Sequence, residues 1–394
     1  MGRLTRAELQ KRTRARVLAA AREEFAEHGY DAARIDGIAE RAELTRGAVY
    51  SNFPGKRALY FAVLADLAEA DRPGPADGAG AGEDLTVPGV LAAFARAWVA
   101  RLPLATDDRY DDARLGRDLM PVIVADELTR RPFAQLVRLN ALLLALALEN
   151  LAPHARRVRL AHTALTLLHG ASRLAAAAPG FVEPFDVVTA CGRLADLHLD
   201  DAWHPPATTT PALPTDEAWT PPPARDAARG EPAPLGGDGV VALLGLHRLA
   251  AVEDAVRAAP PGARVTAVLV TGAADELAPL ARLTVADLSG CLRQAVPATA
   301  WPRLQVVHDP SGELAAAAGL PAVSDGTEAA VRVEGGRIVA RADGLGACHA
   351  AATATATPTA TPTATVTPRP SPHRSAHQPA APEPRPAPRP PRTG

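Results

Sequence analysis

The chain has 394 residues, including 38 prolines and 30 glycines, and its 42 basic side chains nearly balance its 44 acidic ones. This length predicts two or three domains with linkers, and the balanced charge excludes a uniformly basic nucleic-acid-binding surface. The scattered Cys191, Cys291 and Cys348 form no C-x-x-C pair, which favours a reducing interior over secretion. The longest apolar run, Ala141 to Leu148, falls short of the roughly 20 residues of a membrane span. We therefore expect a soluble, cytoplasmic protein with no membrane partner.

Residues 1–70 are predicted to form a compact helical domain that begins with a basic arm. Apolar side chains at helical spacing predict a first helix from Thr13 to His28, which Gly29 ends. A second short helix is expected to begin at Ile35, a third at the N-cap Thr45, and a fourth with Pro54 in its first turn. Two short helices joined by a tight turn have the dimensions of a helix-turn-helix, whose second helix enters the DNA major groove.

The third helix lies within the stretch LTRGAVYSNF, at residues 44–53, which has an unusual composition. A helix that reads a groove needs small residues near its start, and polar groups for phosphates and base edges. The residues that supply this mixture are Thr45, Arg46, Gly47, Tyr50, Ser51 and Asn52. The alternative is a plain helical domain whose arginines form a solvated face. For Tyr50 alone, a packing role is an equally good interpretation.

Residues 10–67 resemble the DNA-binding domain of the TetR family of transcriptional regulators. The residues that follow the family's order and spacing are Phe25, Gly29, Tyr30, Ile38, Ala39, Ala42, Gly47, Tyr50, Phe53 and Lys56. The resemblance implies that the residues facing DNA are Thr45, Arg46, Tyr50, Ser51 and Asn52. It also implies that Lys56, near the start of the fourth helix, meets a phosphate. The residues that it places in the core are Phe25, Ile38, Val49 and Phe53.

Two departures from the family pattern concern stability. Arg34 stands where the family usually has Thr or Ser, and Gly37 where it has a carboxylate, so the second helix loses a capping box worth about 1 kcal/mol. The turn has Glu43 where the family has glycine, and a positive φ there would carry a cost. Neither change removes an implied DNA contact.

A second helical domain is expected at residues 88–200, after a Gly/Pro-rich break, and it resembles the family only in architecture. The implied roles are effector binding and dimerisation. A stripe of small and aliphatic residues would pair with a second copy, or would be core within one chain: Ala161, Ala164, Leu165, Leu168, Ala171 and Leu174. The candidates for lining an effector pocket, each with core packing as the alternative, are Trp98, Tyr110, Met120 and Phe133. His162 and His169 lack cysteine or carboxylate partners, so we expect no metal site.

The remaining chain is predicted to contain a Pro-rich linker at 203–237, an α/β domain at 238–348 and a disordered Ala/Thr/Pro/Arg tail at 349–394. Buried strands are expected in VVALLGL and VTAVLVT, and Gly335-Gly336 predicts a hairpin. This order resembles a thioredoxin-like domain of the peroxiredoxin or monooxygenase-tail kind. The helix after its first strand has no cysteine, so a redox-inactive binding or scaffold module is expected.

The expected fold class is mainly α, with a helix-turn-helix and a helical ligand-binding and dimerisation domain before a smaller α/β domain. The family resemblance implies a homodimeric regulator, a repressor on a palindromic operator in double-stranded DNA, released by a small-molecule effector. We expect no enzyme activity and no cofactor. The alternatives are a redox protein or sensor centred on residues 238–348, and an architectural DNA binder without an effector.

Overall fold

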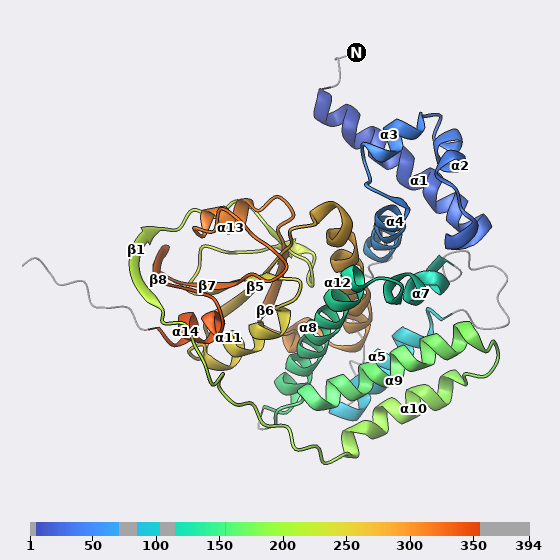
Figure 1. Ribbon diagram of the computed structural model, residues 1–394. Coiled ribbons are helices and arrows are strands. Elements are labelled where there is room, and N and C mark those ends of the chain that lie inside the picture. The colour runs from blue at the N-terminus through green and yellow to red at the C-terminus, as the bar shows by residue number, and fades with distance from the viewer. Residues whose placement is uncertain (1–4, 71–84, 103–114, 154, 355–394) are drawn as a thin grey trace, which may run out of the picture. The chain divides into compact units, whose positions relative to one another are not determined.

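The computed structural model describes residues 5–70, 85–102, 115–153 and 155–354 (Figure 1). These described residues belong to one compact unit. One continuous hydrophobic cluster runs through it from the N-terminal helices to the sheet. The Gly/Pro-rich break at 71–84 and the tail from residue 355 lie outside the described residues.

Four helices form the N-terminal region: α1 (Arg6–Ala32), α2 (Ile35–Arg41), α3 (Arg46–Tyr50) and α4 (Lys56–Ala70). Helix α1 starts earlier than the sequence predicted, because Thr5 and Glu8 form a capping box. Gly29 has a φ of +71°, which breaks the regular helix at the expected place. Helix α4 begins at Lys56, so Pro54 precedes it instead of lying in its first turn.

The next helices are α5 (Val87–Val99), η1 (Gly116–Asp118), α7 (Leu119–Val124), α8 (Glu127–Leu151), α9 (Val158–Ala177), α10 (Pro184–Arg193) and η2 (Leu194–Asp196). On α9, most of the stripe proposed for dimer contact is buried against the chain's own helices, because α9 packs on α5, α8 and α10. Only Leu174 of that stripe is exposed. The stripe is therefore intrachain core.

Helix α8 is the one helix among the described residues that is long and apolar enough to cross a membrane. Its most apolar window is 61% buried within the protein, and it packs against α9 and α12 (Ala274–Ala295). The helix thus has the surroundings of a core helix in a folded domain.

A six-stranded mixed sheet forms the C-terminal region, in the order β1-β8-β7-β4-β5-β6. The strands are β1 (Leu213–Ala218), β4 (Gly239–Gly245), β5 (Arg264–Val270), β6 (Leu304–His308), β7 (Glu328–Glu334) and β8 (Arg337–Asp343). Strands β4, β5 and β6 are parallel, whereas β7 is antiparallel to β4 and β8 is antiparallel to β7. Gly335 and Gly336 both have positive φ, as the expected tight hairpin requires.

The other elements of this region are β2 (Arg225–Asp226), β3 (Glu231–Pro232), η3 (Leu249–Ala251), α11 (Val252–Ala258), η4 (Ala298–Ala300), α13 (Glu313–Ala317) and α14 (Ala347–Thr353). Side chains alternate across the sheet, so that Ala242 and Leu244 join the cluster shared with the helices, while Val241 and Leu243 join a second cluster. The two predicted buried strands, β4 and β5, and the predicted hairpin between β7 and β8 are observed.

Two predicted domain boundaries differ from the structure. The segment predicted to be only a linker contains β1, which pairs with β8 as an edge strand, where Pro214 is tolerated. Trp219 after it is buried, and its Nε1 donates to the carbonyl oxygen of Leu235 at 2.7 Å. The predicted tail begins inside α14, which packs against β7 and β8, so the first residues assigned to the tail are helical.

Candidate nucleic-acid interface

Helix α3 is anchored by its buried face. Thr45 is its N-cap, and the Thr45 Oγ1 accepts a hydrogen bond from the Ala48 backbone N–H at 3.2 Å. Val49 is 1% exposed and packs in the same cluster as Ile38 and Phe53. The polar residues between these anchors consequently face outward.

Arg46 and Tyr50 lie together on that outward face. The Arg46 guanidinium carbon lies 5.6 Å from the centroid of the Tyr50 ring, and its Nη1 lies 3.4 Å from an Asp36 oxygen. Tyr50 is 42% exposed, which does not fit a residue that serves mainly in packing. Both side chains are accessible to a partner in solution.

Ser51 and Asn52 close the end of α3 with local hydrogen bonds. The Ser51 Oγ and the Asn52 Nδ2 both donate to the Ala48 carbonyl oxygen, at 2.9 and 2.8 Å. Arg14 of α1 donates to the Asn52 carbonyl oxygen at 2.9 Å and lies over the Phe53 ring. Arg14 thus ties α3 to α1, a role that no pattern in the sequence indicates.

Gly47 has open space around it. A Cβ there would find only Thr45 Oγ1 within 4 Å, at 3.9 Å. Packing within the chain therefore does not require glycine at this position, whereas close approach of an external partner to the α3 backbone would.

Lys56 has partners within the chain. Its Nζ donates to the carbonyl oxygens of Tyr30, Asp31 and Ala33 at 2.8, 3.1 and 3.3 Å, and lies 4.6 Å from the Tyr30 ring centroid. Lys56 therefore holds the end of α1 against the start of α4. A phosphate contact by Lys56 stays a prediction.

The missing cap of α2 is replaced by Glu24 from α1. Arg34 is the N-cap of α2 and gives no side-chain hydrogen bond, as expected. The Glu24 Oε1 instead accepts from the Arg34 backbone N–H at 3.1 Å, and the Glu24 Oε2 accepts from Arg41 Nε at 2.9 Å. A Cβ at Gly37 would lie 2.8 Å from Glu24 Oε1. Gly37 thus leaves the space that the Glu24 carboxylate of α1 occupies at the start of α2.

The turn between α2 and α3 carries the strain that the sequence predicted. Glu43 has a φ of +50° and is the one non-glycine residue with positive φ in the described part of the chain. Arg16 of α1 contacts the Ala42 carbonyl oxygen, and its Nη2 lies 3.2 Å from Glu43 Oε2. These contacts hold the turn in its left-handed conformation.

Residues 17–63 match the family model described as bacterial regulatory proteins, tetR family. They form a TetR-type helix-turn-helix domain. A 65-residue stretch is 49% identical to the uncharacterized HTH-type transcriptional regulator TtgW of a Pseudomonas putida strain, covering 16% of this chain and 48% of that protein. The identity is 48% over 65 residues with the HTH-type transcriptional regulator SrpR of Pseudomonas putida, covering 16% of this chain and 30% of that protein. The chain thus spans less than half the length of these curated relatives.

A solved structure of the fatty acid degradation regulator FadR from Bacillus halodurans is also similar, at 16% sequence identity. The similarity covers 47% of this chain and 99% of that one, with a TM-score of 0.25. Because the TM-score is so low, nothing about the arrangement of this chain follows from it.

Two of the candidate effector residues C-terminal to the TetR-type domain, Trp98 and Phe133, pack against the same histidine. Trp98 and Phe133 lie edge-on to His169, with ring centroids 5.0 and 5.9 Å away. Trp98 Nε1 donates to Ser172 Oγ at 2.9 Å, and burial lowers the pKa of His169. Met120 is half-buried against the same core.

Of the four candidates, Tyr110 lies outside the described residues. Effector binding by Trp98, Met120 and Phe133 stays a prediction.

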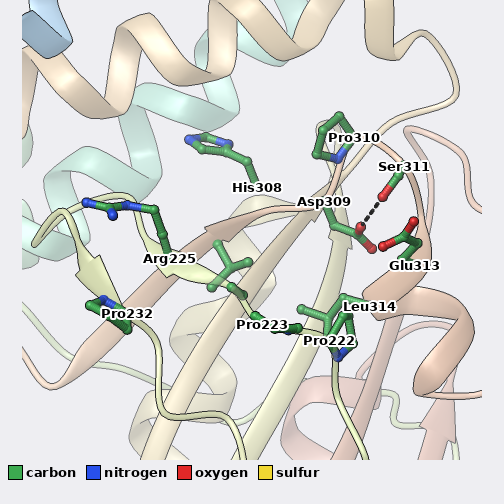
Figure 2. Close-up of a pocket in the computed structure, with 12 residues that line it drawn as sticks. Pro222, Pro223, Arg225, Pro232, His308, Asp309, Pro310, Ser311, Glu313 and Leu314 are labelled. Atoms are coloured by element: carbon green, nitrogen blue, oxygen red, sulfur yellow. Dashed lines mark hydrogen bonds between the residues drawn. The ribbon is translucent and has the colours of Figure 1, made fainter. Parts of the chain in front are cut away.

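A hollow of about 410 Å³ lies in the α/β region, where the sequence analysis placed no site (Figure 2). Figure 2 shows Arg225 and His308 on one side of it and Asp309, Ser311 and Glu313 on the other. Asp309 is buried, and its Oδ2 accepts from the Ala315 backbone N–H at 2.8 Å. The hollow follows the carboxyl end of β6, an edge at which α/β sheets commonly bind ligands.

The three cysteines lie buried and unpaired by disulfides. Burial raises the pKa of the Cys191 thiol to about 11 and that of Cys348 well above its usual value. Burial also raises the pKa of Cys291, although Arg101 beside it acts in the opposite direction. Thiolates, the reactive form in exchange chemistry, are therefore disfavoured at all three positions.

Proposed function

We propose that the chain is a DNA-binding transcriptional regulator of the TetR type, acting as a repressor that a small-molecule effector releases from DNA. The observation that carries the proposal is the outward polar face of α3 on a well-packed helix-turn-helix, in the stretch that matches the tetR family model. Arg46 and Tyr50 supply groups for phosphates and base edges, and Gly47 leaves the backbone accessible.

The proposal includes binding as a homodimer to a palindromic operator, because one short helix such as α3 contacts too few bases for selectivity. Two copies about 34 Å apart would read two half-sites. Exposed apolar side chains on and beside α9 and α10 support such a pairing. Phe181 and Phe185 are 71% and 80% exposed, and Leu174 and Leu197 are exposed nearby.

Release by an effector would follow if the effector binds more tightly to the chain when α3 is placed unfavourably for DNA. The redox alternative is disfavoured because the cysteines are buried with raised pKa values. A thioredoxin-like relationship of the α/β region is part of the proposal, as a redox-inactive module. Its strand and hairpin order supports this interpretation.

The test is selection of duplexes from a random-sequence library by the full chain, followed by affinity measurements on the selected duplex. Arg46→Ala and Tyr50→Ala should each weaken binding by about 1–3 kcal/mol. Arg130→Ala is a matched control, because its side chain is 58% exposed against 60% for Arg46 and pairs with Glu127 on α8. If neither α3 variant changes the affinity while the fold is intact, the proposed docking of α3 is wrong.

A further inference from the structure

Helix α12 connects β5 and β6 of the sheet, yet its main contacts are with the helical half of the chain, helices α1–α10. It packs against α4, α5 and α8 (Figure 1). Four consecutive residues, 283–286, are buried, and at 100° per residue these face all sides of the helix. A helix that only covered a sheet would bury a single stripe. The α/β region is therefore built into the core of the helical half.

Ion pairs join α12 to the start of α4. Arg57 of α4 donates through its Nε to Glu276 of α12 at 2.6 Å, and through Nη1 to Asp126 at the start of α8, also at 2.6 Å. The side chains of Arg57 and Glu276 are only 21% and 19% exposed. The residue before Arg57 is Lys56, which holds the end of α1.

A second set of ion pairs joins α12 to the end of α4. Arg282 donates through Nη2 to Asp66 at 2.9 Å and to Glu69 at 2.7 Å, and its Nε donates to Glu69 at 3.0 Å. Helix α4 is thus fixed to α12 near both of its ends, by partly buried charges whose interaction is screened less than that of surface pairs.

The charges of α12 also reach the residue that ties α3 to α1. Burial and the positive charge of Arg282 lower the pKa of Arg14, against the opposing effect of Asp66 and Asp275. Arg14 donates to the carbonyl oxygen of Asn52, directly after α3. Displacement of α12 would therefore act on α3 through α4, which packs against α1, the helix whose Arg14 holds the end of α3.

We propose that α12 makes the α/β region a control element for DNA binding, with Glu276 and Arg282 as positioning residues that set the place of α4 and, through it, of α3. This inference rests on the proposed DNA-binding function. In this inference the α/β region regulates DNA binding, in addition to the scaffold role that the sequence predicted. A ligand or partner that shifts α12 can change the affinity for DNA by no more than the difference between the affinities of that ligand or partner for the two positions of α12.

The first experiment measures amide hydrogen exchange in the full chain without DNA. Arg282→Glu should speed exchange in α3 and α4, whereas Arg341→Glu should not. Arg341 is a matched control in the same region, because its side chain is 25% exposed against 29% for Arg282 and pairs with Glu217 of β1 at 2.9 Å. Faster exchange confined to α12 would overturn the inference, whether or not the chain binds DNA.

The second experiment measures the affinity of the full chain for the duplex that the unmodified protein selects, and the half-site spacing preferred by each variant. Arg282→Glu should weaken binding on the order of tenfold and alter the preferred spacing. Arg282→Glu combined with Glu69→Arg should restore both in part, because the pair with residue 69 is rebuilt with its charges exchanged while Asp66 still faces a carboxylate. Partial unfolding of a variant would lower the active fraction, but the molecules that stay folded would keep the half-site spacing preference of the unmodified protein. Glu276→Gln is a milder change, at the contact between α12 and the start of α4, and it should also weaken DNA binding.

Unchanged affinity and spacing in folded Arg282→Glu and Glu276→Gln would refute the positioning role. If the unmodified chain selects no duplex, the proposed function fails, and control of DNA binding by α12 fails with it. Coupling between α12 and α4 would then be judged by hydrogen exchange alone.

Discussion

Glu24 and Gly37 should be energetically coupled, because the side chain of one occupies the space that a side chain on the other would need. Gly37→Ala in a helix ordinarily gains about 1 kcal/mol of stability. Here the new Cβ would lie 2.8 and 2.9 Å from the two Glu24 carboxylate oxygens. Glu24 is 4% exposed, and its carboxylate is held by Arg34 and Arg41, so it has little freedom to move aside.

The magnitude follows from the hydrogen bonds at risk. A bond to a charged group contributes about 1.5–3 kcal/mol, so displacement of Glu24 should outweigh the helix-propensity gain. We expect Gly37→Ala to destabilise the chain by about 1 kcal/mol. In a Glu24→Ala background the space is open, and the same change should stabilise by about 1 kcal/mol. The coupling energy is then about 2 kcal/mol.

Urea unfolding of the four proteins of this cycle measures the coupling, with hydrogen exchange of α2 amides as a local readout. The effect of Gly37→Ala should reverse its sign between the two backgrounds. If Gly37→Ala stabilises the unmodified chain as much as the Glu24→Ala variant, the carboxylate does not replace the missing cap.

Three further predictions concern strain, protonation and thiol reactivity. Glu43→Gly should stabilise by about 0.5 kcal/mol in urea unfolding and Glu43→Ile should destabilise, since φ is +50°; the opposite ranking would show that the turn is unstrained. Burial lowers the pKa of His169 in the folded chain. Below about pH 6.5 the unfolded chain therefore binds more protons than the folded chain, and the free energy of unfolding decreases as the pH is lowered. Between pH 7.5 and pH 5.5, the melting temperature of His169→Phe should decrease by less than that of the unmodified chain. An equal decrease in both proteins would contradict this. Iodoacetamide at pH 7.5 should label the cysteines only after unfolding, because burial raises their pKa values; rapid native labelling would revive the redox alternative.

The sequence by itself determined the elements whose causes are local. Helical spacing, the N-cap Thr45 and the glycine at 29 specified the helix-turn-helix. Buried apolar runs specified β4 and β5, and the paired glycines specified the β7–β8 hairpin. In each case the deciding interaction joins residues a few positions apart, so the order of residues carries the information.

Tertiary structure alone decided the features whose partners lie far apart along the chain. The carboxylate that caps α2 comes from Glu24, the ammonium of Lys56 binds the end of α1, and the α9 stripe turns inward. No pattern in the sequence links α12 to the N-terminal helices, but Arg282 meets Glu69 more than two hundred residues earlier. Helical periodicity predicts that a face is buried, but the partner that buries it is set by three-dimensional packing of the whole chain.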